Sequence, residues 1–348
     1  MKKTPLSLLL LMLLFAFSSC EPDFNQNADY KDVTIAYGFL NPQDSRHYLK
    51  VYKAFLTNDN AIVEAGKLDN ITYYDSISVA IEEYQNPRQT NPSKVIPFTM
   101  TTAVPKDSGV FAYNPQVIYY SDAKLDQNAV YKLKIVNKFT QKTITAMTPL
   151  VKNFALHGSS IPYEEARFAL GHAPVTVKFY TAENAVMYDF YLKFHYVEVD
   201  TLSGDTITPN GLVSWRMARL HHSGNNSYLE TKLPLYRLYS VIGQNLKNKK
   251  EHVVRYIKGR KCVDLEIWAA EENYSTYLDH FQPSSSVVQD RADFTNMECM
   301  DGTAYGVFSS RNYAKRSYKI INVPAWALED SLIYGSETKN LGFRKYVD

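Results

Sequence analysis

Short runs of alternating apolar and polar residues recur along most of this chain. The run ISVAIEEY at 77–84 is the clearest. A period of two places successive side chains on opposite faces of a β-strand, so each run predicts a strand with one buried face. Seven such runs precede residue 152, at 33–40, 47–56, 77–84, 94–100, 116–120, 129–138 and 143–150. Because turn-forming residues separate them, they predict an immunoglobulin-like β-sandwich over 33–151.

The pattern changes between residues 152 and 174, where glycines and prolines interrupt the alternation. We place a domain boundary there. Strand-like runs resume at 175–180, 186–199, 206–208, 212–220, 253–257, 262–269, 305–309 and 318–323. Near 234–246 and 271–281 the apolar residues recur at helical spacing instead. The sequence therefore predicts a mainly β protein, in which a second β-rich domain over 152–348 carries one or two packed helices.

The N-terminus has the pattern of an export signal. Lys2 and Lys3 precede an apolar run from Leu6 to Phe17, and the motif Phe-Ser-Ser-Cys ends at Cys20. The run is shorter than the roughly 20 apolar residues that span a bilayer, which favours cleavage. We predict a lipoprotein signal peptide over 1–19, with a diacylglyceryl group on the thiol of Cys20 and a fatty acid such as palmitate on its amine. An ordinary signal peptide with a chance cysteine is the alternative.

A polar segment follows the lipidation motif. Residues 20–32 contain no apolar run and predict a flexible tether. Glu21 and Asp23 resemble the acidic signal that sends lipoproteins to the cell surface in diderm bacteria of the Bacteroidetes type. We therefore expect a lipid-anchored outer-membrane protein that faces the cell surface, with the periplasmic face as the alternative.

Composition narrows the classes of partner. The formal net charge is only +2, and Lys and Arg are spread along the chain, so no nucleic acid is expected. Tyrosine is unusually frequent, with 27 residues against 17 Phe and 3 Trp. Tyr suits half-buried strand faces, because its ring is apolar and its hydroxyl stays wet. It also suits surfaces that bind sugars or proteins.

Two cysteines remain after lipidation, Cys262 and Cys299. An exported location permits disulfides, and two cysteines allow a single intramolecular bridge. Two separate buried thiols are the alternative.

A search for catalytic patterns finds none that holds. Zinc-protease spacing, glycine-rich nucleotide loops and the nucleophile elbow are missing. Ser121 and Lys124 match Ser-x-x-Lys without its partner motifs, and adjacent His221 and His222 would point to opposite faces of a strand. Three acidic pairs are expected on solvated surface, namely Glu82–Glu83, Glu164–Glu165 and Glu271–Glu272. We therefore predict no enzyme activity, no cofactor and no metal.

The tripeptide Asp, hydroxyl residue, aliphatic residue occurs four times. It resembles the O-glycosylation acceptor pattern of exported Bacteroidetes proteins, and the acceptors would be Ser76, Thr201, Thr206 and Ser331. Asp-Ser and Asp-Thr are also common turn residues, so ordinary turns are the alternative.

The mature chain resembles a set of uncharacterised Bacteroidetes lipoproteins that share a domain of unknown function. The resemblance rests on the lipidation motif that ends at Cys20, on the opening strand VTIAYGFL at 33–40, and on a segment near the C-terminal end. That segment holds Tyr274 to Leu278, then Asn296, then GTAYGVF at 302–308. Such lipoproteins are often encoded beside TonB-dependent outer-membrane receptors. The resemblance implies an accessory role at the outer membrane, without an activity or catalytic residues.

The leading expectation is a non-enzymatic accessory or structural partner of an envelope β-barrel complex, either a TonB-dependent receptor or secretion machinery. The alternative is a carbohydrate-binding surface lipoprotein that uses exposed rings as stacking platforms, with Trp215, Trp268 and Trp326 as the first candidates. A hydrolase with dispersed catalytic residues is the third. Exposed aromatics would favour sugar binding, whereas an apolar patch rimmed by polar residues would favour a protein partner.

Overall fold

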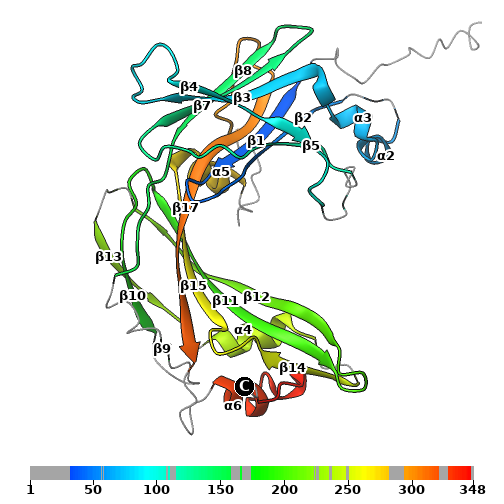
Figure 1. Ribbon diagram of the computed structural model, residues 1–348, viewed down its shortest axis with the longest axis vertical. Coiled ribbons are helices and arrows are strands. Elements are labelled where there is room, and N and C mark those ends of the chain that lie inside the picture. Colours follow the sequence, from blue (N-terminus) through cyan, green and yellow to red (C-terminus); the bar gives the residue numbers. More distant parts are fainter. Residues whose placement is uncertain are drawn as a thin grey trace, which may run out of the picture.

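The structure is a computed structural model that describes residues 32–55, 57, 59–106, 109, 115–157, 165–166, 174–222, 224, 227–234, 237–247, 251–281, 294–320 and 328–345. The predicted mainly β fold is confirmed. Figure 1 shows an elongated molecule in which an upper and a lower unit are joined by long strands. We call these the sandwich unit and the lower unit.

The sandwich unit consists of two facing sheets. The first contains β5 (Thr99–Thr101), β6 (Ile118–Ser121), β2 (His47–Lys53), β1 (Thr34–Leu40) and the first half of β17 (Ala304–Ile320). The second contains β16 (Glu298–Cys299), β8 (Thr143–Pro149), β7 (Val130–Asn137), β3 (Ile77–Tyr84) and β4 (Lys94–Pro97). Short helices α2 (Ala61–Ala65), α3 (Leu68–Ile71) and η1 (Tyr74–Ser76) connect β2 to β3.

The alternating residues of both sheets meet in one core. Leu49 and Phe308 from the first sheet pack with Ile81 and Leu133 from the second, and all four are at most 1% exposed. The period-two pattern gives each strand one apolar face, and burying these faces between the two sheets stabilises the sandwich. The β-sandwich is therefore observed, and the immunoglobulin-like topology stays a prediction.

The lower unit is built on a twisted sheet that continues the first sheet of the sandwich. Its strands run in the order β12 (Thr206–His221), β11 (Met187–Asp200), β15 (Val263–Ala270) and the second half of β17, with β14 (Val253–Ile257) paired to the end of β11. A two-stranded sheet of β10 (Val175–Tyr180) and β13 (Tyr228–Leu233) lies beside it, and β9 (Glu165–Ala166) pairs with β17. The helical elements are α4 (Leu238–Asn245), α5 (Glu272–Phe281), α6 (Leu328–Tyr334) and η3 (Lys339–Leu341).

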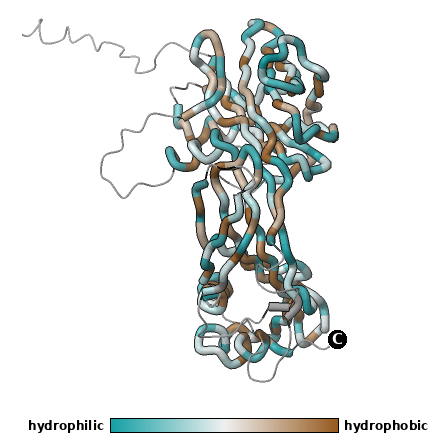
Figure 2. Tube along the Cα trace, turned by 90° about the vertical axis from the view of Figure 1, so that its left-hand side faces the viewer, coloured by the Kyte–Doolittle hydropathy of each residue, from teal (hydrophilic) through white to brown (hydrophobic). Residues whose placement is uncertain are grey.

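Only one face of the lower sheet belongs to its core. Phe190 of β11 and Ile267 of β15 are fully buried, together with Phe179 of β10, Leu238 of α4 and Leu332 of α6. The residues of β11 and β15 that point the other way include the charged Asp189, Lys193 and Glu266 and the aromatic Tyr191 and Trp268. Figure 2 shows hydrophobic and hydrophilic residues interspersed along the long strands of the lower unit. We call the second surface the polar face.

Strand β17 belongs to both units. Its first half pairs in parallel with β1, where Thr34 lies opposite Ala304, and its second half pairs antiparallel with β15. The chain leaves the sandwich core at Leu150, enters the lower core at Val151, and later returns residues 298–310 to the sandwich. The two units are therefore joined by continuous hydrogen-bonded sheet.

Gly306 makes the parallel pairing possible. It lies opposite Ala36 and has φ +110°, a conformation that residues with a side chain rarely adopt. A Cβ atom there would lie 1.9 Å from the carbonyl oxygen of Ala36. Glycine allows the two backbones to approach without this clash.

Candidate functional site

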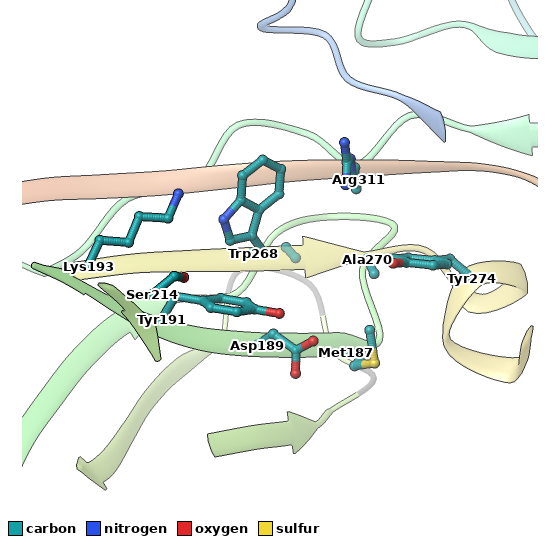
Figure 3. A pocket seen from close by; sticks show the side chains of 10 residues that line it. Met187, Asp189, Tyr191, Lys193, Ser214, Trp268, Ala270, Tyr274 and Arg311 are labelled. Atoms are coloured by element: carbon teal, nitrogen blue, oxygen red, sulfur yellow. The ribbon is translucent and has the colours of Figure 1, made fainter. Parts of the chain in front are cut away.

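A cavity opens on the polar face, at the end of the lower sheet where α5 begins. Its volume is about 250 Å³. Alternate residues of β11 and the last three residues of β15 line it, together with one residue each from β12, α5 and β17. The lining residues are Met187, Asp189, Tyr191, Lys193, Ser214, Trp268, Ala269, Ala270, Tyr274 and Arg311 (Figure 3). Because the intervening residues of β11 face the core, the period-two alternation brings its four lining side chains to one surface, and strand pairing adds those of β12, β15 and β17. We call this cavity the Trp268 pocket.

Three contacts fix the Trp268 ring in place. It stacks on Tyr313 of the neighbouring strand, with ring centroids 4.8 Å apart and 27° between the planes. Its Nε1 donates a hydrogen bond of 2.9 Å to Glu266 Oε2. The guanidinium carbon of Arg311 lies 4.9 Å from the ring centroid. The ring is therefore held in one orientation at the wall of the pocket.

Arg311 connects the pocket to the sandwich unit. Its guanidinium also lies 5.9 Å from the Phe39 ring, and Phe39 packs on Tyr274 with centroids 4.5 Å apart. The Nε atom of Arg311 is buried and has no hydrogen-bond partner. Within the described ranges, Arg311 forms no ion pair. Aromatic rings are its only close partners there.

Both carboxylates nearest to the pocket are bound by cations. Asp189 accepts two hydrogen bonds of 2.7 Å from Arg219, in the bidentate geometry that strengthens such pairs. Glu266 lies 2.6 Å from Lys193 Nζ and also accepts the Trp268 bond. Asp189 and Glu266 are only 6% and 5% exposed, so both charges depend on these partners.

Two hydroxyls face one another across the pocket. Figure 3 shows the phenol groups of Tyr191 and Tyr274 pointing toward each other. Neither hydroxyl has a hydrogen-bond partner among the described residues. Burial raises the pKa of both, and the Asp189 carboxylate raises that of Tyr191 further. Both groups therefore stay protonated at neutral pH and can donate hydrogen bonds to a ligand.

A second polar cluster lies further along the same face. Asp264 accepts a hydrogen bond of 2.6 Å from Ser317, and its other oxygen lies 2.8 Å from His195 Nε2 and 2.7 Å from Lys315 Nζ. Burial pushes the pKa of Asp264 up, but these partners outweigh it and the pKa is lowered. Ser317 binds the carboxylate and not the imidazole, so the cluster lacks the relay of a serine hydrolase.

The expectation that the acidic pairs are solvated is wrong for three residues. Glu82, Glu83 and Glu271 are at most 8% exposed. Glu82 pairs with Lys134 at 3.0 Å and Glu83 accepts a bond from Tyr131. Burial raises the pKa of Glu271, which accepts bonds from Ser309 and from the backbone of α5. Glu272 is exposed, and the side chains of Glu164 and Glu165 lie outside the described residues.

The two cysteines are not brought together. Cys262 and Cys299 are free thiols, because they pack in the lower core and against the sandwich core respectively. The structure therefore has the second alternative, two separate thiols. Within the described ranges, no three His, Cys, Asp or Glu side chains gather in a way that could hold a metal ion. Cys20 lies outside the described residues.

The four candidate glycosylation residues differ in access. Thr201 and Thr206 are exposed at the tip of the hairpin between β11 and β12. Ser76 is half-buried and donates a 2.5 Å bond to the carbonyl of Tyr73, and Ser331 is half-buried in α6. Glycosylation stays a prediction at all four, and access favours the two threonines.

Of the three tryptophans, one lies in the pocket. Trp268 lines it, Trp215 packs against the lower core, and Trp326 lies outside the described residues. Sequence reasoning missed Asp189, Tyr191 and Arg311. The signal for the first two was their alternation with core residues in the run 186–199, but Arg311 reaches the pocket only through strand pairing, because it lies opposite Ala270.

The chain matches no protein-family model and no curated protein. None of the helices in the described part of the chain combines the length and the apolar character that crossing a bilayer requires. The site must therefore be interpreted from its own chemistry.

Proposed function

We propose that this protein is a non-enzymatic, lipid-anchored outer-membrane protein that binds carbohydrate in the Trp268 pocket. The observation that carries the proposal is the fixed Trp268 ring beside the two unengaged hydroxyls of Tyr191 and Tyr274. A sugar offers an apolar ring face for stacking and hydroxyls for hydrogen bonding. A mostly aromatic wall with a few directed polar groups is the usual design of such sites.

The state of the carboxylates supports binding over catalysis. General acid–base chemistry needs a carboxyl group that is free to exchange a proton with the substrate. Asp189 and Glu266 are instead held by Arg219 and Lys193. Carboxylates bound in this way position their neighbours and neutralise charge.

The attachment point of the tether supports presentation away from the membrane. The predicted anchor at Cys20 leads into β1 at the end where Thr34 lies opposite Ala304. From there β17 runs toward the lower unit, and Arg311 follows Ala304 by seven residues. At about 3.3 Å per residue, the pocket lies roughly 23 Å from that end of the strand, before the length of the tether is added. This arrangement suits a surface-facing lipoprotein, as does the resemblance to Bacteroidetes lipoproteins.

A second candidate is an accessory role beside an envelope β-barrel, such as a TonB-dependent receptor or secretion machinery. The observation that favours it is the outer edge of β12. This strand pairs with β11 on one side, and no described strand pairs with its other side. A free edge can add a strand from a partner.

Glycan binding tests the first candidate. The full lipoprotein, purified from gently solubilised membranes, is applied to an array of neutral and acidic oligosaccharides. We expect binding that Trp268→Ala abolishes and Trp268→Phe retains in part. Tyr305→Ala is the control, because Tyr305 is 42% exposed on the same strand as Arg311 but pairs with β1 in the sandwich. Equal binding by the wild type and Trp268→Ala would contradict the proposal.

Co-purification tests the second candidate. A C-terminally tagged protein, extracted in mild detergent, should bring a β-barrel receptor or secretion component in stoichiometric amount. Replacing Leu212, an exposed residue of β12 that does not line the pocket, by proline should remove that partner. A monomeric protein without companions would contradict the accessory role.

A further inference from the structure

We infer that the ligand of the Trp268 pocket is an acidic saccharide, whose carboxylate binds Arg311. This inference rests on the proposed function and narrows the proposed ligand to one class of saccharide. It depends on three features of the pocket: the absence of an anion beside Arg311, the charge balance of the lining, and the size of the cavity.

Arg311 differs from Arg219 and Arg255 because no carboxylate pairs with it within the described ranges. Arg219 binds Asp189, and Arg255 binds Glu198 at 2.8 Å. Even Arg46, which is exposed and lies over the Tyr120 ring, is paired with Asp122. Arg311 is half-buried between Phe39 and Trp268 and forms no ion pair within the described ranges. Its planar guanidinium has the donor geometry that matches a carboxylate.

The charges around the pocket leave an excess of one cation. Asp189 cancels Arg219, and Glu266 cancels Lys193. The charge of Arg311 remains. A neutral ligand would leave this charge uncompensated, whereas an anionic ligand would neutralise it.

The cavity limits the ligand to about one ring. Its 250 Å³ lies just below the usual range of small-molecule pockets, roughly 300–1,000 Å³. A single pyranose stacked on Trp268 places its hydroxyls toward Tyr191 and Tyr274. A carboxylate on that ring then reaches Arg311, which lies beside the same tryptophan. A terminal uronic acid combines all of these groups.

The test compares acidic sugars with their neutral counterparts. The probes are trisaccharides of galacturonic, glucuronic and mannuronic acid, each paired with its carboxyl-reduced form. Binding to the full lipoprotein in detergent is measured by calorimetry. We expect at least one acid to bind about tenfold more tightly than its reduced form. The affinity for that acid should fall as the salt concentration rises. Arg311→Gln should abolish this difference, and Arg311→Lys should retain part of it.

A control variant and the pattern of binding distinguish a failure of this inference from a failure of the proposed function. Arg46→Gln removes an arginine that also contacts an aromatic ring, the Tyr120 ring of β6, but that does not line the pocket, and it should change nothing. Circular dichroism confirms that each variant is folded. If reduced sugars bind as tightly as the acids, or Arg311→Gln leaves the difference intact, the inference fails while carbohydrate binding stands. If the wild type binds no saccharide, the proposed function fails as well.

Discussion

The Arg311 guanidinium lies 4.9 Å from the centre of the Trp268 ring, across the pairing of β17 with β15. The contact lies at the point where β17 passes from the sandwich unit to the lower unit. The pocket is therefore built at the junction, and its walls depend on both units. Predictions about the pocket and about the junction are linked for this reason.

The Trp268–Arg311 contact should be measurable in a double-mutant cycle. We expect Trp268→Leu and Arg311→Gln to destabilise the protein by less together than the sum of the single changes. The coupling should be about 0.5–2 kcal/mol, the range of partly desolvated cation–π pairs. Chemical denaturation of the four proteins gives the value. Additive effects would show that the two side chains are neighbours without interacting.

Gly306→Ala should disrupt the junction. The added Cβ would meet the carbonyl oxygen of Ala36 at 1.9 Å, and φ +110° strains any residue with a side chain. We expect a loss of at least about 2 kcal/mol in the free energy of unfolding. Gly204→Ala is the matched control, since Gly204 also has positive φ but meets nothing within 4 Å. Equal losses in the two variants would mean that backbone strain alone is responsible and that the close approach is unimportant.

Asp264 should make stability depend on acid pH. Its folded pKa lies below the unfolded value of about 3.9, so its ionised form stabilises the protein above that pH. This contribution is lost as pH falls from about 4 through the lowered folded pKa. Asp264→Asn should cost about 1–3 kcal/mol at pH 7, because hydrogen bonds to a charged group are lost. The variant should also lose stability less steeply below pH 4.

Urea denaturation at several pH values checks this prediction. Asp205→Asn serves as the control, because Asp205 is exposed in the turn before β12. A pH profile of Asp264→Asn parallel to that of the wild type would refute the assigned role of the cluster.

Cys262 and Cys299 should remain reduced even after export. Burial raises the pKa of both thiols, and Cys299 also donates a hydrogen bond to Asp301 at 3.0 Å. The thiolate is the reactive form, so native protein should react slowly with iodoacetamide. After unfolding without reductant, both cysteines should be alkylated, which mass spectrometry counts. A peptide pair that joins Cys262 to Cys299 would contradict the structure.

Several strands could be predicted from the sequence to the residue, because turn-forming or charged residues bound short runs rich in β-branched and aromatic residues. The runs at 77–84, 175–180 and 253–257 coincide with β3, β10 and β14. Strand β17 was predicted as two separate strands. Its middle section buries Asn312, which donates to the carbonyl of Val151, and it therefore lacks an apolar period. The helices α2 and α6 were missed because both are short.

The candidate site could be predicted only in part. Trp268 was named with Trp215 and Trp326 as a candidate stacking platform, but its neighbour Arg311 is distant in sequence. Their proximity depends on the register that places Ala270 opposite Arg311. The sequence favoured a protein partner over a sugar, on the predicted anchor, the strand-rich aromatic chain and the lack of a catalytic pattern. The pocket's aromatic wall and unengaged hydroxyls reverse that order in our proposal.

Carbohydrate binding by the purified lipoprotein, compared with Trp268→Ala, tests the central claim most directly. We expect the wild type to bind at least one oligosaccharide with a calorimetric signal that the variant lacks, while Tyr305→Ala binds normally. Absence of binding to every neutral and acidic saccharide by a folded wild-type protein would contradict the account.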